Sequence, residues 1–228
     1  MTEPDGPAPP RLAREWERSL SPELGPEDEW RDLLVTGADL TGARAEDASI
    51  FGCHLQATRL TAADLTGLSV TDVIFEDGDL SAAQLSHASL LRTEFRSCLM
   101  AEAVLSDVRL RQVRFHRCRL DGANLRFATL EGLHMTECSL VGADLTEASA
   151  NGLVMEGCSL SGVILTKARL GAVSLDGCQL DGLKGASALA GARVDRTAAI
   201  PLGLAFMAEF GIQFAEERGA DPSAGDDH

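Results

Sequence analysis

The chain has 228 residues, of which 45% are apolar and only 4% aromatic, and its formal net charge is −15 at pH 7. This composition excludes a wholly disordered chain, and the scarcity of aromatic residues disfavours a core built on large rings. The acidic charge also disfavours direct binding to nucleic acid or to anionic membranes. Many small and branched side chains must therefore fill the interior.

The first segment, residues 1–31, is predicted to form an N-terminal arm or cap. It begins with the proline-rich stretch EPDGPAPP, and LAREWERSL predicts a short amphipathic helix. The chain lacks a basic region followed by an apolar one, and eighteen apolar residues never occur in a row. We therefore expect a cytoplasmic chain that does not cross a membrane. Its six cysteines are expected to stay reduced in that compartment.

Residues 32–184 show an unbroken five-residue period. Every fifth residue from Val35 to Leu180 is apolar, and the residue two positions before each of these is mostly small. The remaining three positions carry almost all the charges, and the last of them is rich in glycine. A period of five matches neither the helical period of 3.6 nor the strand period of 2. It predicts a coil of short sides joined by turns, with an interior filled by side chains.

Within this segment GADLTGARA, TAADLTGLS, DGANLRFATL and VGADLTEAS resemble the A(D/N)LXX consensus of the pentapeptide-repeat family. The resemblance implies an all-β solenoid, a right-handed quadrilateral β-helix with four pentapeptides in each coil. The length of the periodic segment then gives about seven to eight coils of twenty residues. The resemblance is specific for the fold and says little about function.

Twenty residues per coil would place residues twenty apart directly above one another, at the spacing of neighbouring strands. The large inward positions then predict a stack of Phe75, Phe95 and Phe115. One ladder of small inward positions holds five cysteines: Cys98, Cys118, Cys138, Cys158 and Cys178. Stacked thiols point in parallel and do not converge, so we predict buried small apolar groups, with metal binding and redox chemistry as the alternatives. Cys53 fits the same kind of slot on another side.

No pattern in the chain predicts catalysis, a cofactor or a metal. Four histidines fall at outward positions, and no two are expected to share a side on adjacent coils: His54, His87, His116 and His134. The stretch GCSLSG lacks the glycine spacing of a nucleophile elbow. The glycines are spread as coil corners and form no phosphate-binding loop. The chain is therefore predicted not to be an enzyme.

Outward basic residues form a belt around about one coil: Arg109, Arg111, Arg114, Arg117, Arg119 and Arg126. A belt that circles the column suits DNA-backbone binding poorly, because such binding needs a one-sided track. One interpretation is solvated charge paired with nearby acids such as Glu94, Asp107, Asp121 and Glu131. The other is a protein contact in which Arg111, Arg114 and Arg117 take part.

Three outward apolar residues, Phe51, Ile74 and Leu91, are predicted to lie on one side of three successive coils. An exposed apolar patch usually receives another surface. Either the N-terminal arm, which carries Trp16 and Trp30, folds back over it, or the patch docks another protein.

The five-residue phase slips after Leu183, and residues 185–214 are predicted to form an irregular last coil and a C-terminal helix. The helix is expected over residues 198–210, with Thr197 as its N-cap, Pro201 in its first turn and Gly211 at its stop. One apolar face would plug the last coil, and a second would need a partner. The candidate cap or dimer residues are Leu202, Leu204, Phe206, Met207 and Phe210. Relatives in the resembled family form head-to-head dimers through such a helix, which implies a homodimer.

Residues 215–228 are predicted to be a disordered acidic tail.

The leading functional prediction is a non-enzymatic, cytoplasmic protein that serves as an interaction surface or scaffold for another protein. The resemblance implies an alternative, a duplex-DNA mimic that binds DNA gyrase, a type II topoisomerase, and protects it from fluoroquinolones. Mimicry needs a nearly continuous anionic stripe. The acids cluster only briefly, at Glu76, Asp77 and Asp79. Arginines then interrupt at Arg96, Arg117 and Arg119, and no side is acidic throughout. The sequence therefore favours the interaction surface.

Overall fold

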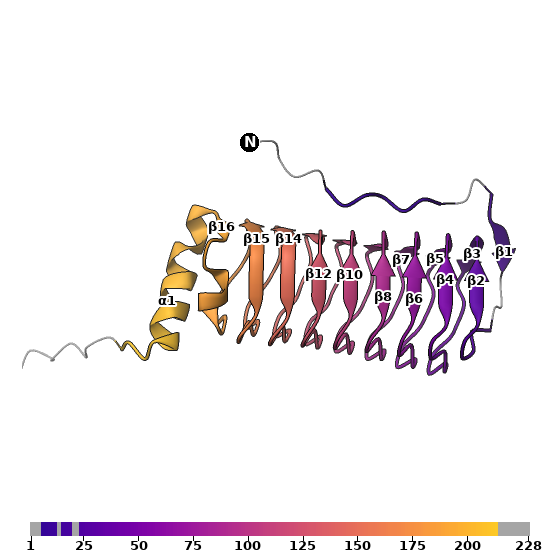
Figure 1. Ribbon diagram of the computed structural model, residues 1–228, viewed down its shortest axis with the longest axis horizontal. Coiled ribbons are helices and arrows are strands. Elements are labelled where there is room, and N and C mark those ends of the chain that lie inside the picture. The colour runs from indigo at the N-terminus through magenta and orange to yellow at the C-terminus, as the bar shows by residue number, and fades with distance from the viewer. Residues whose placement is uncertain (1–5, 13–14, 20–22, 214–228) are drawn as a thin grey trace, which may run out of the picture.

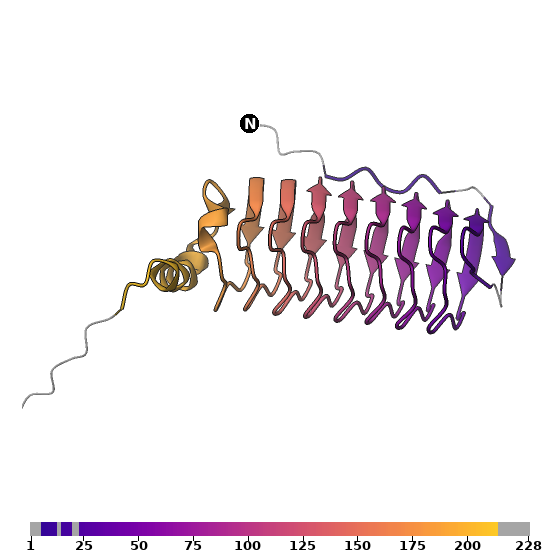
Figure 2. The ribbon, with the colours of Figure 1, turned by 60° about the horizontal axis from the view of Figure 1, so that its bottom comes forward.

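The structure is a computed structural model that describes residues 6–12, 15–19 and 23–213. It is a parallel β-solenoid of about nine turns followed by a single C-terminal helix (Figures 1 and 2). The predicted all-β solenoid, a right-handed β-helix, is therefore confirmed, with about nine turns where about seven to eight coils were predicted. The tail predicted to be disordered, residues 215–228, lies outside the described residues.

The strands form two ladders along the solenoid, and each strand pairs in parallel with strands one coil away. The first ladder consists of β2 (Glu29–Arg31), β4 (Ser49–Phe51), β6 (Ser69–Thr71), β8 (Ser89–Leu91), β10 (Arg109–Arg111) and β12 (Thr129–Glu131). The second consists of β1 (Glu17–Ser19), β3 (Leu33–Thr36), β5 (His54–Gln56), β7 (Ile74–Glu76), β9 (Glu94–Arg96), β11 (Arg114–His116) and β13 (His134–Thr136). Both ladders join in β14 (Ser149–Glu156), which is followed by β15 (Arg169–Asp176) and β16 (Arg193–Val194).

From β2 to β15 the register between coils is twenty residues, so each inward side chain rests on its equivalents. Phe75 pairs with Phe95, and Phe95 pairs with Phe115. Their rings are stacked with centroids 4.8 and 4.7 Å apart, at interplanar angles of 5° and 7°. Gaps of about 10 to 20 Å³ remain between the apolar side chains of the interior that the structure describes. The predicted stack is confirmed, and the column is filled along its axis.

All six cysteines are buried and free. Successive thiols of the predicted ladder make the same contact: the Cys98 Sγ lies 3.5 Å from the Phe75 carbonyl oxygen, and the Cys118 Sγ lies 3.4 Å from that of Phe95. Within the described ranges, no three His, Cys, Asp or Glu side chains are grouped so that they could hold a metal ion. The cysteines therefore occupy small interior slots, as predicted.

One corner of the coil runs between the two strand ladders, and its row of residues has positive φ. The row runs from Asp32 (φ 53°) to Ala172 (φ 48°), and its middle consists of Asp72 (58°), Arg92 (46°) and Gln112 (56°), with Gly52 (62°) before them and Gly132 (59°) after them. Left-handed backbone is unusual for residues with a Cβ atom. We call the three consecutive polar residues of this row, Asp72, Arg92 and Gln112, the corner row.

The solenoid begins earlier than its five-residue period predicts. The helix predicted for LAREWERSL is wrong, because Glu17–Ser19 forms β1 and pairs in parallel with β3. Trp30 in β2 pairs with Ile50 and is only 5% exposed, so its ring closes the interior at this end. The open backbone edge of the first full coil explains this pairing, because unpaired strand N–H and C=O groups need partners.

The C-terminal end consists of the 3-10 helix η1 (Ala186–Leu189), β16, the 3-10 helix η2 (Arg196–Ala198) and α1 (Ala199–Glu209). The predicted helix is therefore present, but Thr197 is not its N-cap. The side chain of Asp195 accepts the Thr197 N–H at 2.6 Å, and this turn precedes α1. Across the described segments, no helix has the length and apolar character needed to span a bilayer.

Candidate interaction surfaces

The N-terminal arm lies extended along one side of the solenoid and follows the corner row (Figures 1 and 2). The Ala8 N–H donates to Gln112 Oε1 at 2.7 Å, and the Arg11 N–H donates to Asp72 Oδ1 at 2.8 Å. The Arg114 guanidinium donates to the carbonyl oxygen of Pro7. Pro7 itself is a buried residue. Arg114, a candidate partner-binding residue by sequence, therefore contacts the chain's own arm.

Asp72 is one of two acceptors, with Gln112, that join the arm to the corner row. Arg92 donates to both of its oxygens, at 2.7 and 2.6 Å, and the two side chains are 20% and 14% exposed. Burial acts to raise the pKa of Asp72, but hydrogen bonds from Arg92 and from the Arg11 N–H outweigh it and lower this pKa. The carboxylate therefore stays ionised and keeps its acceptor oxygens toward the arm.

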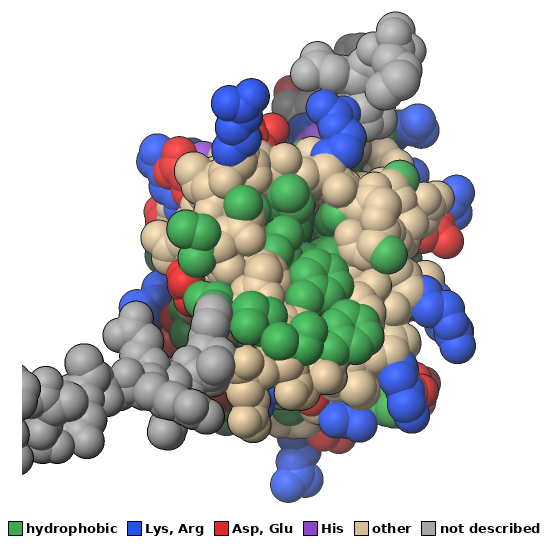
Figure 3. Space-filling view, turned by 90° about the vertical axis from the view of Figure 1, so that its left-hand side faces the viewer, with side chains coloured by type: hydrophobic (Ala, Val, Ile, Leu, Met, Phe, Trp, Pro, Cys, Tyr) green, Lys and Arg blue, Asp and Glu red, His purple; other side chains and the backbone are tan. Residues whose placement is uncertain are grey.

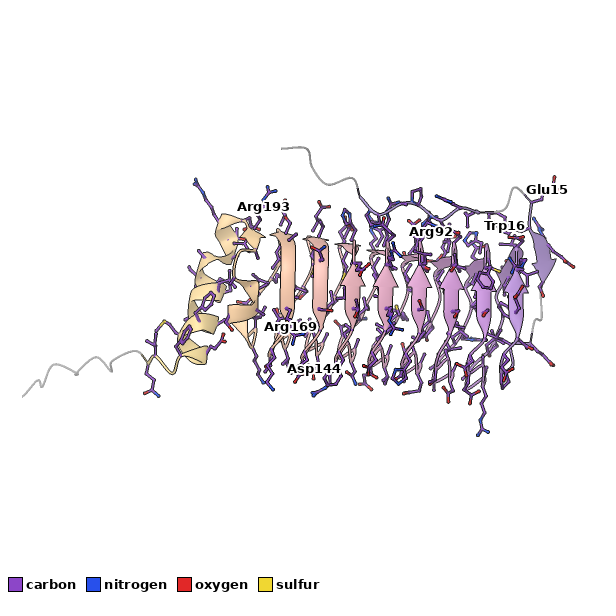
Figure 4. All side chains as sticks on the ribbon, viewed as in Figure 1. Glu15, Trp16, Arg92, Asp144, Arg169 and Arg193 are labelled. Atoms are coloured by element: carbon purple, nitrogen blue, oxygen red, sulfur yellow. The ribbon has the colours of Figure 1, made fainter. Side chains whose placement is uncertain are left out.

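Trp16 holds the other end of the arm, near the first coils. Its indole N–H donates to the Gly52 carbonyl oxygen at 2.9 Å, and its ring centroid lies 5.7 Å from that of His54. Figure 4 shows Trp16 and Arg92 on the side of the column that the arm follows. The expectation that the arm folds back thus holds for Trp16, whereas Trp30 lies in the interior.

The predicted apolar patch of Phe51, Ile74 and Leu91 does not form. Ile74 lies in β7 of the second ladder and is 6% exposed, whereas Phe51 and Leu91 lie in the first ladder with Thr71 between them. Phe51 also stacks beneath the Arg31 guanidinium, 4.8 Å from its ring centroid. Ile74 is 23 residues from Phe51, three more than one coil, and therefore lies on the strand beyond the corner, over His54.

Two candidate partner-binding residues, Leu91 and Arg111, do meet in one place. Both line a shallow groove of about 290 Å³ across β8, β10 and β12, together with Ser89, Arg109, Thr129 and Glu131. The Arg111 guanidinium lies 3.7 Å from the Glu131 carboxylate. This groove is open, but its basic side chain already has an acidic neighbour.

Acidic and basic side chains are interleaved along the column. Arg117 lies 2.8 Å from Glu137, and Lys167 lies 3.4 Å from Glu147, so both pairs bridge residues one coil apart. The basic belt is thus at least partly paired with acids, as one of its two interpretations predicts. Interleaved pairs interrupt negative charge along a side and do not favour duplex-DNA mimicry.

Two histidines share a side, contrary to the sequence expectation. His116 is in β11 and His134 is in the adjacent strand β13, but their registers differ, because Arg114 is the residue paired with His134. Burial lowers the pKa of His134, and the positive charge of Arg114 lowers it further. This arrangement favours a neutral imidazole at His134.

The C-terminal end carries a second exposed surface, on α1 and the residues after it. Four apolar side chains there are strongly exposed: Ile200 (76%), Leu204 (50%), Phe210 (68%) and Ile212 (56%). Leu202 and Phe206 are partly buried and pack against the core. Figure 3 shows hydrophobic side chains at the centre of this end, with Lys and Arg side chains around its rim. We call this surface the end face.

Two protein-family models match the periodic segment of the chain. A family model described as "Pentapeptide repeat region" matches residues 68–145, and one described as "Pentapeptide repeats (8 copies)" matches residues 35–77 and 138–182. Together they cover residues 35–182, about two thirds of the chain. No curated protein matches the sequence.

Solved structures of similar proteins include HetL, a pentapeptide repeat protein involved in heterocyst differentiation regulation, from the cyanobacterium Nostoc sp. strain PCC 7120. It has 22% identity and a TM-score of 0.47, and the match covers 69% of this chain and 74% of HetL. Trypsin-treated QnrB1, a plasmid-mediated fluoroquinolone resistance protein, has 20% identity and a TM-score of 0.42. That match covers 87% of this chain and 99% of QnrB1.

Proposed function

The chain belongs to the pentapeptide-repeat family, and from this premise we propose that it is a non-enzymatic protein-interaction scaffold that forms a homodimer through α1. The observation that carries this proposal is the end face. A contiguous exposed apolar surface rimmed by charge is typical of a protein contact. Ile200 and Phe210 are 76% and 68% exposed, which is costly for apolar side chains that have no partner.

The candidate residues of α1 divide into two groups by burial. Leu202 and Phe206 pack against the core and cap the last coil, together with Ala205, which is 7% exposed. Leu204 and Phe210, the residue that follows α1, are exposed, and Met207 is partly buried, as Leu202 and Phe206 are. The division supports one helix that serves both purposes, with the capping side directed inward and the docking side outward.

A second copy of the chain is the occupant that fits this surface. The exposed side of α1 is apolar and can therefore pack against itself across a two-fold axis. The one acid in the helix, Glu209, accepts the Ser187 N–H at 3.0 Å and the Ser187 hydroxyl at 2.5 Å, which ties it to η1. Its charge is thus held against the chain's own backbone.

The interior offers little room for a substrate. Its gaps of about 10 to 20 Å³ are lined by apolar side chains, whereas a ligand site of several hundred Å³ with convergent polar groups is usual for enzymes. The larger grooves lie on the outside, where another protein can reach them. These features support an interaction role.

Light scattering of the purified full chain tests the homodimer. We expect the wild type to have twice the chain mass of 24.1 kDa and Leu204→Asp to have the mass of one chain. Leu99→Asp is the matched control, because Leu99 is 43% exposed but lies on the side of the column, and this variant should stay dimeric. A wild type that is monomeric at micromolar concentration, or a loss of dimer in Leu99→Asp as well, would overturn the proposal.

A further inference from the structure

Each backbone N–H group in the proline-rich part of the arm donates a hydrogen bond to a side chain of the corner row. Between Pro7 and Arg11 only Ala8 and Arg11 have a backbone N–H, because proline has none. Both of these N–H groups are hydrogen bonded to side chains of the corner row, Gln112 and Asp72. Each residue before a proline is also restricted to extended backbone. The segment from Pro7 to Arg11 is therefore held extended, and it has no backbone N–H group without a hydrogen bond to the column.

The spacing of the two contacts also agrees with the geometry of the column. Ala8 and Arg11 are three residues apart, which is about 9.3 Å in a polyproline II helix. Their acceptors, Gln112 and Asp72, are forty residues apart, which is two coils at a register of twenty. Two strand spacings amount to about 9.6 Å. A polyproline II segment thus meets one side chain of every second coil without stretching or slipping.

We propose, resting on the interaction role above, that the corner row is a recognition track for extended proline-rich segments, and that residues 6–12 occupy it in cis until a partner's segment displaces them. The partner segment would have two backbone donors three residues apart, separated by prolines. It would also have a carbonyl group positioned for Arg114, as Pro7 has in the arm.

The arm can leave the track without opening the interior. Residues 6–12 pair with no strand, and Ala8, Pro9 and Arg11 are exposed. Their described polar contacts are made to side chains at the surface of the column. The corner row keeps its own order when the arm is absent, because Arg92 fixes Asp72 through two hydrogen bonds. Displacement therefore exchanges one ligand for another on a preformed surface.

The experiment uses a fluorescein-labelled peptide of residues 6–16, GPAPPRLAREW, and measures its anisotropy with the full-length protein. In one protein the arm is wild type, and in the other it carries Pro9→Gly and Pro10→Gly, which loosen it. We expect the loosened protein to bind the peptide at least about tenfold more tightly, because a tethered arm competes at an effective concentration near the millimolar range. Circular dichroism checks that both proteins are folded.

Two matched changes locate the binding. A peptide with Ala8→Pro lacks one donor and should lose most of its binding. Within the loosened protein, Gln112→Met removes the acceptor and should weaken binding at least about fivefold, whereas Gln112→Glu keeps an oxygen acceptor and should bind normally. Failure of the peptide to bind either protein, equal binding to both, or indifference to Ala8→Pro would each overturn the proposal.

Light scattering of the same samples separates this inference from the proposed function. A dimeric protein that ignores the peptide would overturn the track and leave the homodimer standing. A monomeric protein that binds the peptide would overturn the homodimer and leave the track standing.

Discussion

The two ends of the solenoid cover the same apolar interior in different ways. At the N-terminal end, Trp30 closes the column from within a strand, and β1 adds a further strand beyond it. At the C-terminal end, α1 lies across the last coil and buries only part of its apolar surface, with Ile200 and Phe210 exposed. Strands at one end thus leave no large apolar side chain exposed among the described residues there, whereas the helix at the other end does.

The difference follows from the geometry of the elements. A strand pairs along its backbone and needs no apolar side chain for this, so β1 carries exposed charged residues, Glu17 and Arg18, which discourage pairing with another molecule. A helix with apolar residues on most of its circumference cannot bury them all against one flat coil. The N-terminal end is therefore closed, and the C-terminal end invites a partner.

The largest expected effect comes from removing the ring that closes the N-terminal end. Trp30→Ala should lower the free energy of unfolding by about 3 to 5 kcal/mol, because it leaves a cavity among buried side chains. Phe210→Ala at the other end should change it by less than about 0.5 kcal/mol, since Phe210 is 68% exposed. Urea unfolding measures both changes in a Leu204→Asp background, where subunit association does not contribute. Similar losses in the two variants would contradict the comparison.

A smaller effect concerns which end opens first. The last coil is covered by β16, which has two residues, whereas the first coil is held by β1 and β2, which have three each, and by the arm. A thiol near each end reports local opening. The hydrogen bond with Cys158 and burial raise the pKa of Cys178, and burial raises that of Cys53, so neither reacts while it is covered.

We therefore expect Cys178 to be alkylated by iodoacetamide faster than Cys53 in native protein, as local opening exposes it. Mass spectrometry of digested samples measures both rates in one tube. A fully unfolded sample provides the control, since the two thiols should then react at similar rates. Faster labelling of Cys53 would mean that the N-terminal end is the weaker one.

The smallest effect lies between the ends, where the arm passes His134. Burial and Arg114 hold the pKa of His134 below its usual 6.5. The folded state then binds fewer protons than the unfolded state below pH 6.5, so the free energy of unfolding falls as the pH drops through 6.5 toward the lowered pKa. Urea midpoints at about pH 7.5 and about pH 5.5 should differ more for the wild type than for His134→Gln. An equal difference in both would refute this assignment.

The sequence predicted those parts of the fold that repeat. Each inward slot must hold an apolar group, so the position of Phe95 between Phe75 and Phe115 could be read from spacing alone. The strand at Glu17–Ser19 could not, because its pairing depends on an open backbone edge and not on its side chains. The docking of Ala8 could not either, since its acceptor, Gln112, is 104 residues away.

The candidate surfaces were predicted less well, for a related reason. The twenty-residue register places Thr71 and Leu91 over Phe51, whereas Ile74 is 23 residues from Phe51 and lies over His54, beyond the corner. The prediction of one patch overlooked this offset. On α1, apolar periodicity marked Leu204 and Phe206 equally. Only the position of the last coil decides that Phe206 packs inward and Leu204 faces out.

The twenty-residue register determines which insertions and deletions the solenoid can accept. Deleting or inserting a whole coil keeps every later side chain in its slot, whereas a change that is not a multiple of five residues moves inward side chains to outward positions. The arm adds a second constraint on length, because it spans two coils between Asp72 and Gln112. A coil removed elsewhere shortens the column and spares the arm, but a coil removed between these two residues leaves the arm one step too long. The contacts of the arm therefore require two coils between Asp72 and Gln112.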